Sequence, residues 1–426
     1  MYDNPTYRMY KDILREELRA AMGCTEPIAI AYAASILRDL LGGIPTSVRA
    51  GFSGNIIKNV KSVIVPQTGG RHGIEVAIAS GLVSGRYDKR LEVLTTLTEL
   101  DLPHIDTVLR DTDMDVREIS GDCTFELVLE GALGDLDGAV HISGEHTNVI
   151  LARRGGEVVT EKYLEKLDTG AIKRQTDRSV LSVESIIDFA EHSDISDIRE
   201  LLLGQVNMNM DIAREGLRGS WGASIGKVIL SIGDDVSRRA RAYAAAGSDA
   251  RMSGCEKPVC IISGSGNQGI TASVPVAVYA EHLGASEDEL LRALIVSDLI
   301  TVHQKTGIGT LSAYCGAISA GVGAGAGICY LLGGRYNEIA HTVVNAVAIL
   351  SGTICDGAKP SCAAKIAMAV EAGILGYEMS RLGEEFLGGD GIVTKGVENT
   401  IRNVGRLARD GMSETDREII KIMLDN

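Results

Sequence analysis

The chain has 426 residues, with 42 Lys or Arg against 57 Asp or Glu, so its formal charge is −15. Such an acidic balance argues against a nucleic-acid-binding protein, which needs basic side chains to neutralise phosphates, and against docking on an anionic membrane. Glycine accounts for 50 residues and aromatic residues for only 4%, which predicts closely packed helices around a core of small and aliphatic side chains.

The N-terminal part of the chain predicts two helices. Apolar residues recur at helical spacing over 7–21, and a second helix is expected over 26–41, where Gly42 ends it. The sequence opens without a basic segment followed by an apolar one, so no signal peptide is expected. We therefore expect a cytoplasmic protein whose eight cysteines are reduced.

Residues 44–160 predict a mixed region. Short runs of alternating apolar and polar residues are typical of strands, and Gly155-Gly156 indicates a hairpin before a last short strand. Helical spacing recurs near 72–83 and 96–109. The expected strands are Ser47–Phe52, Asp115–Ile119, Cys123–Leu129, Ala139–Ser143 and Asn148–Ala152.

After Lys162 the spacing of apolar residues is helical almost to the end of the chain. The expected helices are 180–192, 196–215, 233–246, 270–283, 286–300, 311–332, 336–351, 361–376, 392–407 and 414–424. These elements predict an α+β fold, in which a large, mainly helical body with buried Gly/Ala-rich helices carries an inserted α+β subdomain. The body is expected to comprise 1–43 and 161–426, and the insertion 44–160.

One stretch, 306–334, holds no charged residue and is long enough to cross a bilayer. Its many glycines and its Ser, Thr and Tyr residues dilute the apolar character. The stretch therefore predicts a buried helix of small residues rather than a membrane span.

A Gly-rich segment, Ser263–Gly269, contains the pattern G-x-G-x-x-G after a short apolar run. The pattern is typical of dinucleotide-binding loops, but a Rossmann unit needs further parallel strands, and the rest of the chain predicts helices. Backbone N–H groups in such a turn at a helix N-terminus can also bind a carboxylate. A purely structural turn is the other interpretation. The candidate binding residues are Ser263, Gly264, Ser265, Gly266 and Asn267.

The cysteines divide into candidates for chemistry and candidates for packing. Cys355 and Cys362 flank a loop that Gly357 and Pro360 keep out of helix, where the two thiols are either metal ligands or simply buried. Cys24 precedes the second predicted helix, and a helix N-terminus lowers the pKa of a thiol, although a small buried residue would also fit there. We interpret the remaining cysteines outside these segments as structural, namely Cys123, Cys255, Cys260 and Cys329.

Several motifs together resemble the L-cysteine desulfidase family, a group of oxygen-sensitive iron–sulfur enzymes, over nearly the whole chain. The C-terminal body is similar, more distantly, to the α-domain of bacterial iron–sulfur L-serine dehydratases. The motifs are Gly23-Cys24-Thr25-Glu26-Pro27, Ser53-Gly54-Asn55, Pro66-Gln67-Thr68-Gly69-Gly70, Ser263–Gly269, Tyr314-Cys315-Gly316 and Cys355–Cys362.

The resemblance implies a 4Fe-4S cluster held by Cys315, Cys355 and Cys362, with one iron left open, and Cys24 as a functional thiol. It also implies that the Gly-rich loop holds the substrate carboxylate. His146 and Asn55 are weaker candidates for substrate binding, because each also suits a turn or a helix cap. Lys58, His303, Lys305 and Lys359 are further polar residues without an assigned role.

The implied activity is L-cysteine desulfidase, which is a carbon–sulfur lyase. It eliminates the β-substituent of L-cysteine without pyridoxal phosphate and yields pyruvate, ammonia and hydrogen sulfide. The alternatives are an iron–sulfur L-serine or related amino-acid dehydratase and a non-catalytic iron–sulfur redox sensor. The expected partner is a small-molecule substrate, with no nucleic acid and no membrane, and the composition is compatible with a homodimer.

Overall fold

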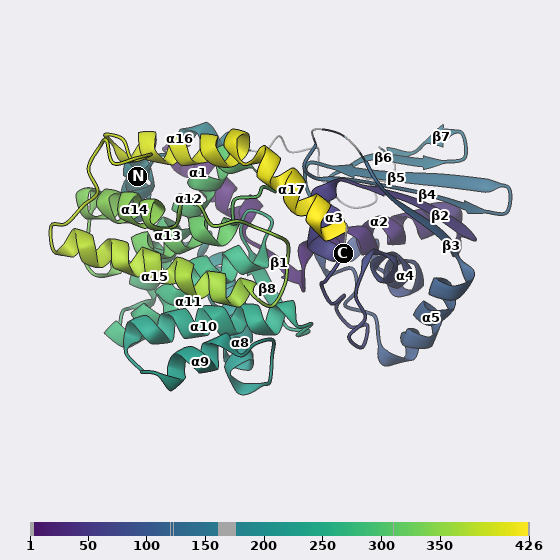
Figure 1. Cartoon of the computed structure of the whole chain (residues 1–426), viewed down its shortest axis with the longest axis horizontal. Coiled ribbons are helices and arrows are strands. Elements are labelled where there is room, and N and C mark those ends of the chain that lie inside the picture. Colours follow the sequence, from purple (N-terminus) through teal and green to yellow (C-terminus); the bar gives the residue numbers. More distant parts are fainter. Residues whose placement is uncertain (1–3, 120, 122, 161–175, 310, 425–426) are drawn as a thin grey trace.

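The structure is a computed structural model that describes residues 4–119, 121, 123–160, 176–309 and 311–424. The fold is α+β, with a helical body and a small mixed sheet, as the sequence predicts. Figure 1 shows the helical body at the left and the sheet with its helices at the right. A two-stranded antiparallel ribbon, β1 (Arg19–Met22) with β8 (Pro258–Ile261), lies between them.

The larger sheet has six strands in the order β3-β2-β4-β5-β6-β7. β2 pairs in parallel with β3, and all other neighbours are antiparallel. The strands agree with the predicted ones to within a few residues. They are β2 (Ser47–Phe52), β3 (Asp113–Glu118), β4 (Glu126–Leu133), β5 (Leu136–Ser143), β6 (Val149–Arg154) and β7 (Glu157–Val158).

One long helix, α2 (Thr25–Leu41), is buried between this sheet and α4 (Ile74–Ser84). The two helices approach closely because α4 has a glycine at the crossing. A Cβ on Gly81 would lie 2.2 Å from the carbonyl oxygen of Ala31. The same side of the molecule holds α3 (Gly54–Val60), α5 (Leu102–Asp111) and the short 3₁₀ helices η1 (Tyr87–Glu92) and η2 (Glu99–Asp101).

The helical body holds the remaining elements of the described residues. They are α1 (Pro5–Glu17), η3 (Arg178–Val180), α7 (Val183–His192), α8 (Arg199–Arg218), α9 (Ile225–Ser231), α10 (Val236–Met252), α11 (Gly266–Leu283), α12 (Glu287–Ile308), α13 (Gly316–Leu331), α14 (Tyr336–Leu350), α15 (Cys362–Arg381), α16 (Val397–Arg406), η4 (Leu407–Gly411) and α17 (Ser413–Leu424).

The helix α13 lies at the centre of the body, packed against α11, α12, α14 and α15. Its glycines allow this, because a Cβ on Gly321 would lie 2.3 Å from the carbonyl oxygen of Ala369, and one on Gly325 would lie 2.5 Å from that of Gly373. Among the described residues, no helix is both long and apolar enough to cross a membrane. The uncharged stretch thus includes a buried helix of small residues, as predicted.

Several predicted helices begin or end elsewhere in the structure, and two of these differences have a clear cause. The helix expected over 7–21 ends at Glu17, because Arg19–Met22 pairs with β8, a distant partner that local spacing does not reveal. The helix expected over 311–332 begins only at Gly316, because Cys315 is its N-cap. The short helices α3 and α9 were not expected.

The division into a body (1–43 and 161–426) and an insertion (44–160) stays a prediction. α2, from the first segment, packs on the sheet of the second, while α1 packs against the body, where Tyr10 donates a hydrogen bond to the carbonyl oxygen of Val180. The second boundary adjoins residues 161–175, which lie outside the described part of the chain.

Candidate active site

Four helices of the described chain point their N-termini at one cavity. α2, α11, α13 and α15 each contribute first-turn or N-cap residues to its wall, and its volume is about 100 Å³. Helix N-termini carry partial positive charge and unsatisfied N–H groups, so their convergence favours anionic ligands and thiolates. A wider cavity of about 590 Å³ adjoins the first and shares His146, Ser263, Gly264 and Lys305 with it.

The site residues that were predicted from the sequence are, with one exception, found in the wall of this one cavity. The first and last of them are more than 300 positions apart along the chain. Gly266 is the exception. A Cβ there would lie 2.5 Å from Nε of Arg251 and 2.6 Å from Val259, so this glycine permits close packing. The residues that do line it are Cys24, Asn55, His146, Ser263, Gly264, Ser265, Asn267, Cys315, Cys355 and Cys362.

The thiol of Cys24 lies at the N-cap of α2, where sequence reasoning expects a lowered pKa. That expectation is wrong for this structure. Burial raises the pKa of Cys24 well above its usual range, and the charge of Glu26 raises it further. The thiol donates a hydrogen bond to Oε2 of Glu26 at 3.0 Å, so Cys24 carries its proton at rest.

The carboxylate of Glu26 is buried among donors. Nδ2 of Asn59 donates to its Oε1 at 3.0 Å, and Nε2 of His146 lies 3.9 Å from the same oxygen. Burial alone would raise the pKa of Glu26, but His146 and the thiol of Cys24 outweigh burial and lower that pKa to about 2. Glu26 is therefore a fixed negative charge in the wall of the cavity.

The Gly-rich loop joins β8 to α11 through a left-handed turn. Ser263 has a φ of 45° and Gly264 a φ of 75°. The N–H of Ser263 donates to Glu17 at 2.9 Å, and the carbonyl oxygen of Gly264 accepts from Thr25 at 2.9 Å. Ser265 is the N-cap of α11 and its side chain makes no capping hydrogen bond, so the first N–H groups of this helix are not capped by that side chain.

The geometry does not match a dinucleotide-binding unit. β8 pairs antiparallel with β1 in a two-stranded ribbon, whereas a Rossmann fold places the Gly-rich turn after a strand of a parallel sheet.

Cys315, Cys355 and Cys362 all line the cavity. Backbone bonds tie the first two segments together, since the N–H of Cys315 donates to the carbonyl oxygen of Thr353 at 3.0 Å and that of Cys355 to Ala313 at 2.6 Å. Burial raises the pKa of Cys315 to about 12, and the thiols of Cys355 and Cys362 raise it further.

Lys305 lies beside these cysteines as a buried cation. It lines both cavities, and within the described part of the chain its ammonium group has no hydrogen-bond or ion-pair partner. Burial lowers the pKa of Lys305 to about 8, against the opposing influence of Cys355 and Cys315. Thiolates at those two positions would balance its charge.

Two polar residues from α3 connect the cysteine loop to the C-terminal helix. Lys58 forms a buried ion pair with Asp416 of α17 and donates to the carbonyl oxygen of Cys355 at 3.3 Å. Asn55 donates to the same carboxylate at 2.7 Å, and its Oδ1 is buried without a partner among the described residues. Asn55 therefore has a structural contact in addition to its place in the cavity wall.

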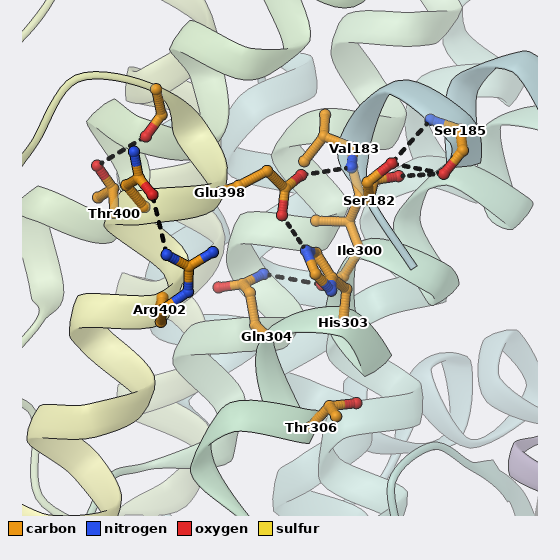
Figure 2. A network of polar contacts seen from close by, with 12 residues as sticks. Ser182, Val183, Ser185, Ile300, His303, Gln304, Thr306, Glu398, Thr400 and Arg402 are labelled. Carbon is orange, nitrogen blue, oxygen red and sulfur yellow. Dashed lines mark hydrogen bonds and ion pairs between the residues drawn. The ribbon is translucent and has the colours of Figure 1, made fainter. Parts of the chain in front are cut away.

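The histidine on α12 and the lysine of the cysteine loop have other partners. Figure 2 shows His303 bound to Glu398, with Nε2 to Oε2 at 2.6 Å, and Oε1 of Glu398 accepting from the N–H of Val183. This network joins α16 to α12 and α7, and its members are not among the residues of the 100 Å³ cavity. Lys359 pairs with Asp356 within the loop.

Five residues of this cavity have a buried polar side-chain atom without a partner in the described chain. They are Asn55, His146, Arg251, Asn267 and Gln268. Such atoms are costly unless a ligand or water satisfies them.

Sequence reasoning missed both Arg251 and Glu26. The signal for Glu26 was a charge in the first turn of an otherwise apolar helix. The signal for Arg251 was a charge on the small-residue face of α10, with Ala244 and Gly247.

Within the described residues, no three His, Cys, Asp or Glu side chains lie close enough together to hold a single metal ion. The eight cysteines are all free thiols.

Comparison with known proteins identifies the family. The family model of the serine dehydratase alpha chain matches residues 89–421. The chain is 54% identical to a UPF0597 protein of Desulfitobacterium hafniense (strain Y51), over 98% of this chain and 97% of the relative. UPF0597 proteins of Lachnoclostridium phytofermentans and Treponema denticola are 47% and 44% identical, over 98% and 99% of this chain and 100% and 99% of each relative. The chain belongs to the serine dehydratase alpha chain family.

Proposed function

We propose that the protein is an iron–sulfur lyase that eliminates the β-substituent of a small α-amino acid, with L-cysteine as the substrate. One observation carries this proposal: a thiol with a bound proton, an anion-binding helix N-terminus and three clustered cysteines line the same cavity. The family is one of dehydratases, which are lyases, and is associated with iron–sulfur clusters.

The donor set fits a cluster better than a single ion. Each cysteine of a four-iron cluster binds a different iron, so its ligands stand farther apart than the ligands of one ion. Cys315, Cys355 and Cys362 are the residues that would hold the cluster, and Lys305 would offset their negative charge. Cys315 is the N-cap of α13 and Cys362 lies in the first turn of α15, and a helix N-terminus favours a thiolate. Burial acts in the opposite direction and raises the pKa of both thiols, so both would have to lose their protons on binding iron.

When bound, a 4Fe-4S cluster with three protein ligands supplies an open iron, which is a Lewis acid for the departing sulfur. The protein's own groups do the rest. The N-terminus of α11 holds the α-carboxylate, and Sγ of Cys24 takes the α-proton and later returns it to the aminoacrylate carbon. Because Cys24 is a thiol at rest, it must first pass its proton to solvent water before its thiolate can act as the base.

The reaction balances without a further reactant except water. L-Cysteine loses its α-proton and its β-sulfur as hydrogen sulfide to give aminoacrylate. Aminoacrylate then tautomerises to the imine, which water hydrolyses to pyruvate and ammonia. L-Serine is the second candidate substrate, and it is favoured by the family match over 89–421. With serine the leaving group would be the hydroxyl.

The test is pyruvate release by anaerobically purified, cluster-reconstituted protein with L-cysteine and L-serine in parallel. We expect pyruvate and an equal amount of sulfide from L-cysteine. Pyruvate from serine alone would transfer the assignment to a serine dehydratase. A protein that holds its cluster but yields pyruvate from neither substrate would contradict both assignments and favour a redox sensor.

A further inference from the structure

Besides the cysteines, the wall of the cavity holds two buried side chains of opposite charge, Arg251 and Glu26. Arg251, near the end of α10, is only 4% exposed, and within the described chain its guanidinium makes no hydrogen bond or ion pair. An uncompensated buried charge costs several kcal/mol, so such a residue persists where a ligand of opposite charge completes it.

Arg251 stands beside the N-terminus of α11. A Cβ on Gly266 would lie 2.5 Å from its Nε, so the guanidinium is in contact with the first residue of this helix. The side chain of the N-cap residue Ser265 does not cap the helix. A guanidinium next to uncapped N–H groups is a binding site for a carboxylate, which both groups can hydrogen-bond at once.

Glu26 supplies the opposite charge. Its carboxylate accepts hydrogen bonds from Asn59, from Cys24 and from the hydroxyl of Thr25, which also donates to Gly264, and an ionised carboxylate has about four acceptor sites. None of these three donors is a cation. Nε2 of His146 forms an ion pair with Oε1 of Glu26, but at 3.9 Å it lies beyond hydrogen-bond distance. The carboxylate therefore retains capacity for a positively charged donor from the cavity.

We infer that Arg251 and Glu26 make this cavity a site for the zwitterion of a small α-amino acid, Arg251 binding the α-carboxylate and Glu26 the α-ammonium group. This inference rests on the proposed function, because it assigns the substrate contacts of the same site. It explains why a cation without a partner and a buried carboxylate are retained in one cavity.

The position of Cys24 agrees with this arrangement. The charges of Glu26 and Arg251 both act on its thiol, in opposite directions. The α-carbon of an amino acid bears both the carboxylate and the ammonium group. A thiol that lies close to both anchors is therefore close to the α-proton, and the three cysteines line the same cavity.

The test measures binding by the cluster-loaded protein with three probes of similar size that have no β-leaving group. L-Alanine carries both charges, propionate lacks the ammonium group, and L-alaninamide lacks the carboxylate. In anaerobic calorimetry, L-alanine should bind at least about tenfold more tightly than propionate or L-alaninamide. Each of these two probes loses one charged hydrogen-bonded contact. Equal affinity for all three probes would overturn the inference.

Two variants separate the anchors from general damage to the fold. Glu26→Gln should abolish the preference for L-alanine over propionate and leave propionate binding unchanged. Arg251→Gln should abolish the preference for L-alanine over L-alaninamide.

Glu256→Gln and Arg214→Gln, at exposed positions, are the matched controls and should bind the three probes as the unaltered protein does. A preference that survives its variant would overturn the inference, and a variant that binds all three probes equally worse would show that its residue only supports the fold.

The binding test is independent of turnover. If pyruvate is not formed but the preferences for the zwitterion hold, the proposed reaction fails and the ligand class stands. If pyruvate is formed but the preferences are absent, the reaction stands and the two anchors are wrong.

Discussion

The thiol of Cys24 donates a hydrogen bond to the carboxylate of Glu26 at 3.0 Å, and both side chains are buried in the wall of one cavity. Glu26 is two residues further along α2, in its first turn. A helix N-terminus that would activate the thiol is thus opposed by a carboxylate that holds its proton in place.

Removal of the charge of Glu26 should make Cys24 more reactive. Burial raises the pKa of Cys24 first, and the negative charge of Glu26 raises it further. Glu26→Gln removes the second contribution, so the thiolate fraction at pH 8 increases. We expect faster alkylation of Cys24 by iodoacetamide, by about tenfold for each unit of pKa, measured by peptide mass mapping. Alkylation that is slower or unchanged relative to Glu256→Gln would contradict this account.

Replacement of Cys24 should separate chemistry from cluster binding. Cys24 contacts Glu26 and does not belong to the group formed by Cys315, Cys355 and Cys362. Cys24→Ala should therefore keep the visible absorption of the reconstituted cluster and lose at least about 100-fold in pyruvate formation, the usual contribution of a proton-transfer group. Loss of the cluster spectrum in this variant would make Cys24 a ligand or a structural residue instead.

The three clustered cysteines should each be needed for the cluster. Serine at position 315, 355 or 362 replaces a soft thiolate by a poor ligand for iron. We expect Cys315→Ser, Cys355→Ser and Cys362→Ser to lose iron and acid-labile sulfide on reconstitution. The control is Cys329→Ser, since Cys329 is buried in α13 but does not line the cavity. Equal iron content in the control and in any of the three would remove that cysteine from the ligand set.

Arg251 should lower the stability of the protein in the absence of amino acid. Replacement of a buried charge by a well-packed apolar side chain is often neutral or stabilising by about 1–4 kcal/mol. Arg251→Met should therefore raise the free energy of unfolding within that range while it weakens ligand binding. Urea unfolding of the two proteins measures the difference, with Arg214→Met as the exposed control. A loss of several kcal/mol would mean that Arg251 has a structural partner.

A buried carboxyl group in the core should make stability depend on pH. Burial raises the pKa of Asp298 to about 7, against the hydrogen bond that Gln205 donates to its Oδ1 at 2.9 Å. The folded protein thus keeps a proton that the unfolded chain releases near pH 4, so the contribution of Asp298 to stability is full below that pH and is lost as the pH rises to 7.

Asp298→Asn removes this titration and keeps an acceptor for Gln205. Above pH 7 we expect the variant to be more stable than the unaltered protein by about 4 kcal/mol, at about 1.4 kcal/mol per unit of pKa, with no such gain at pH 4. Urea unfolding at pH 4, 6 and 8 provides the comparison. A difference between the two proteins that is the same at all three values would show that Asp298 does not titrate in this range.

Much of the secondary structure could be predicted because its signals are local. Gly42 adopts a left-handed φ of 76° at the end of α2, and the uncharged stretch around α13 is helical and buried. One element that depends on a distant partner was predicted wrongly. Arg19–Met22 has helical spacing but is a strand, because its backbone groups bond to Pro258–Ile261.

By itself, the sequence indicated helices over 26–41, 270–283 and 311–332 and the residue types near their starts, such as Cys24, Ser265 and Cys315. Only the tertiary structure decided that these helix N-termini meet in one cavity, that Glu26 reverses the expected pKa shift of Cys24, and that Arg251 stands among them. The physical reason is that helix caps and turns depend on neighbours along the chain. Desolvation and the interaction between charges depend on distances through space, which residues far apart in the sequence establish only when the chain has folded.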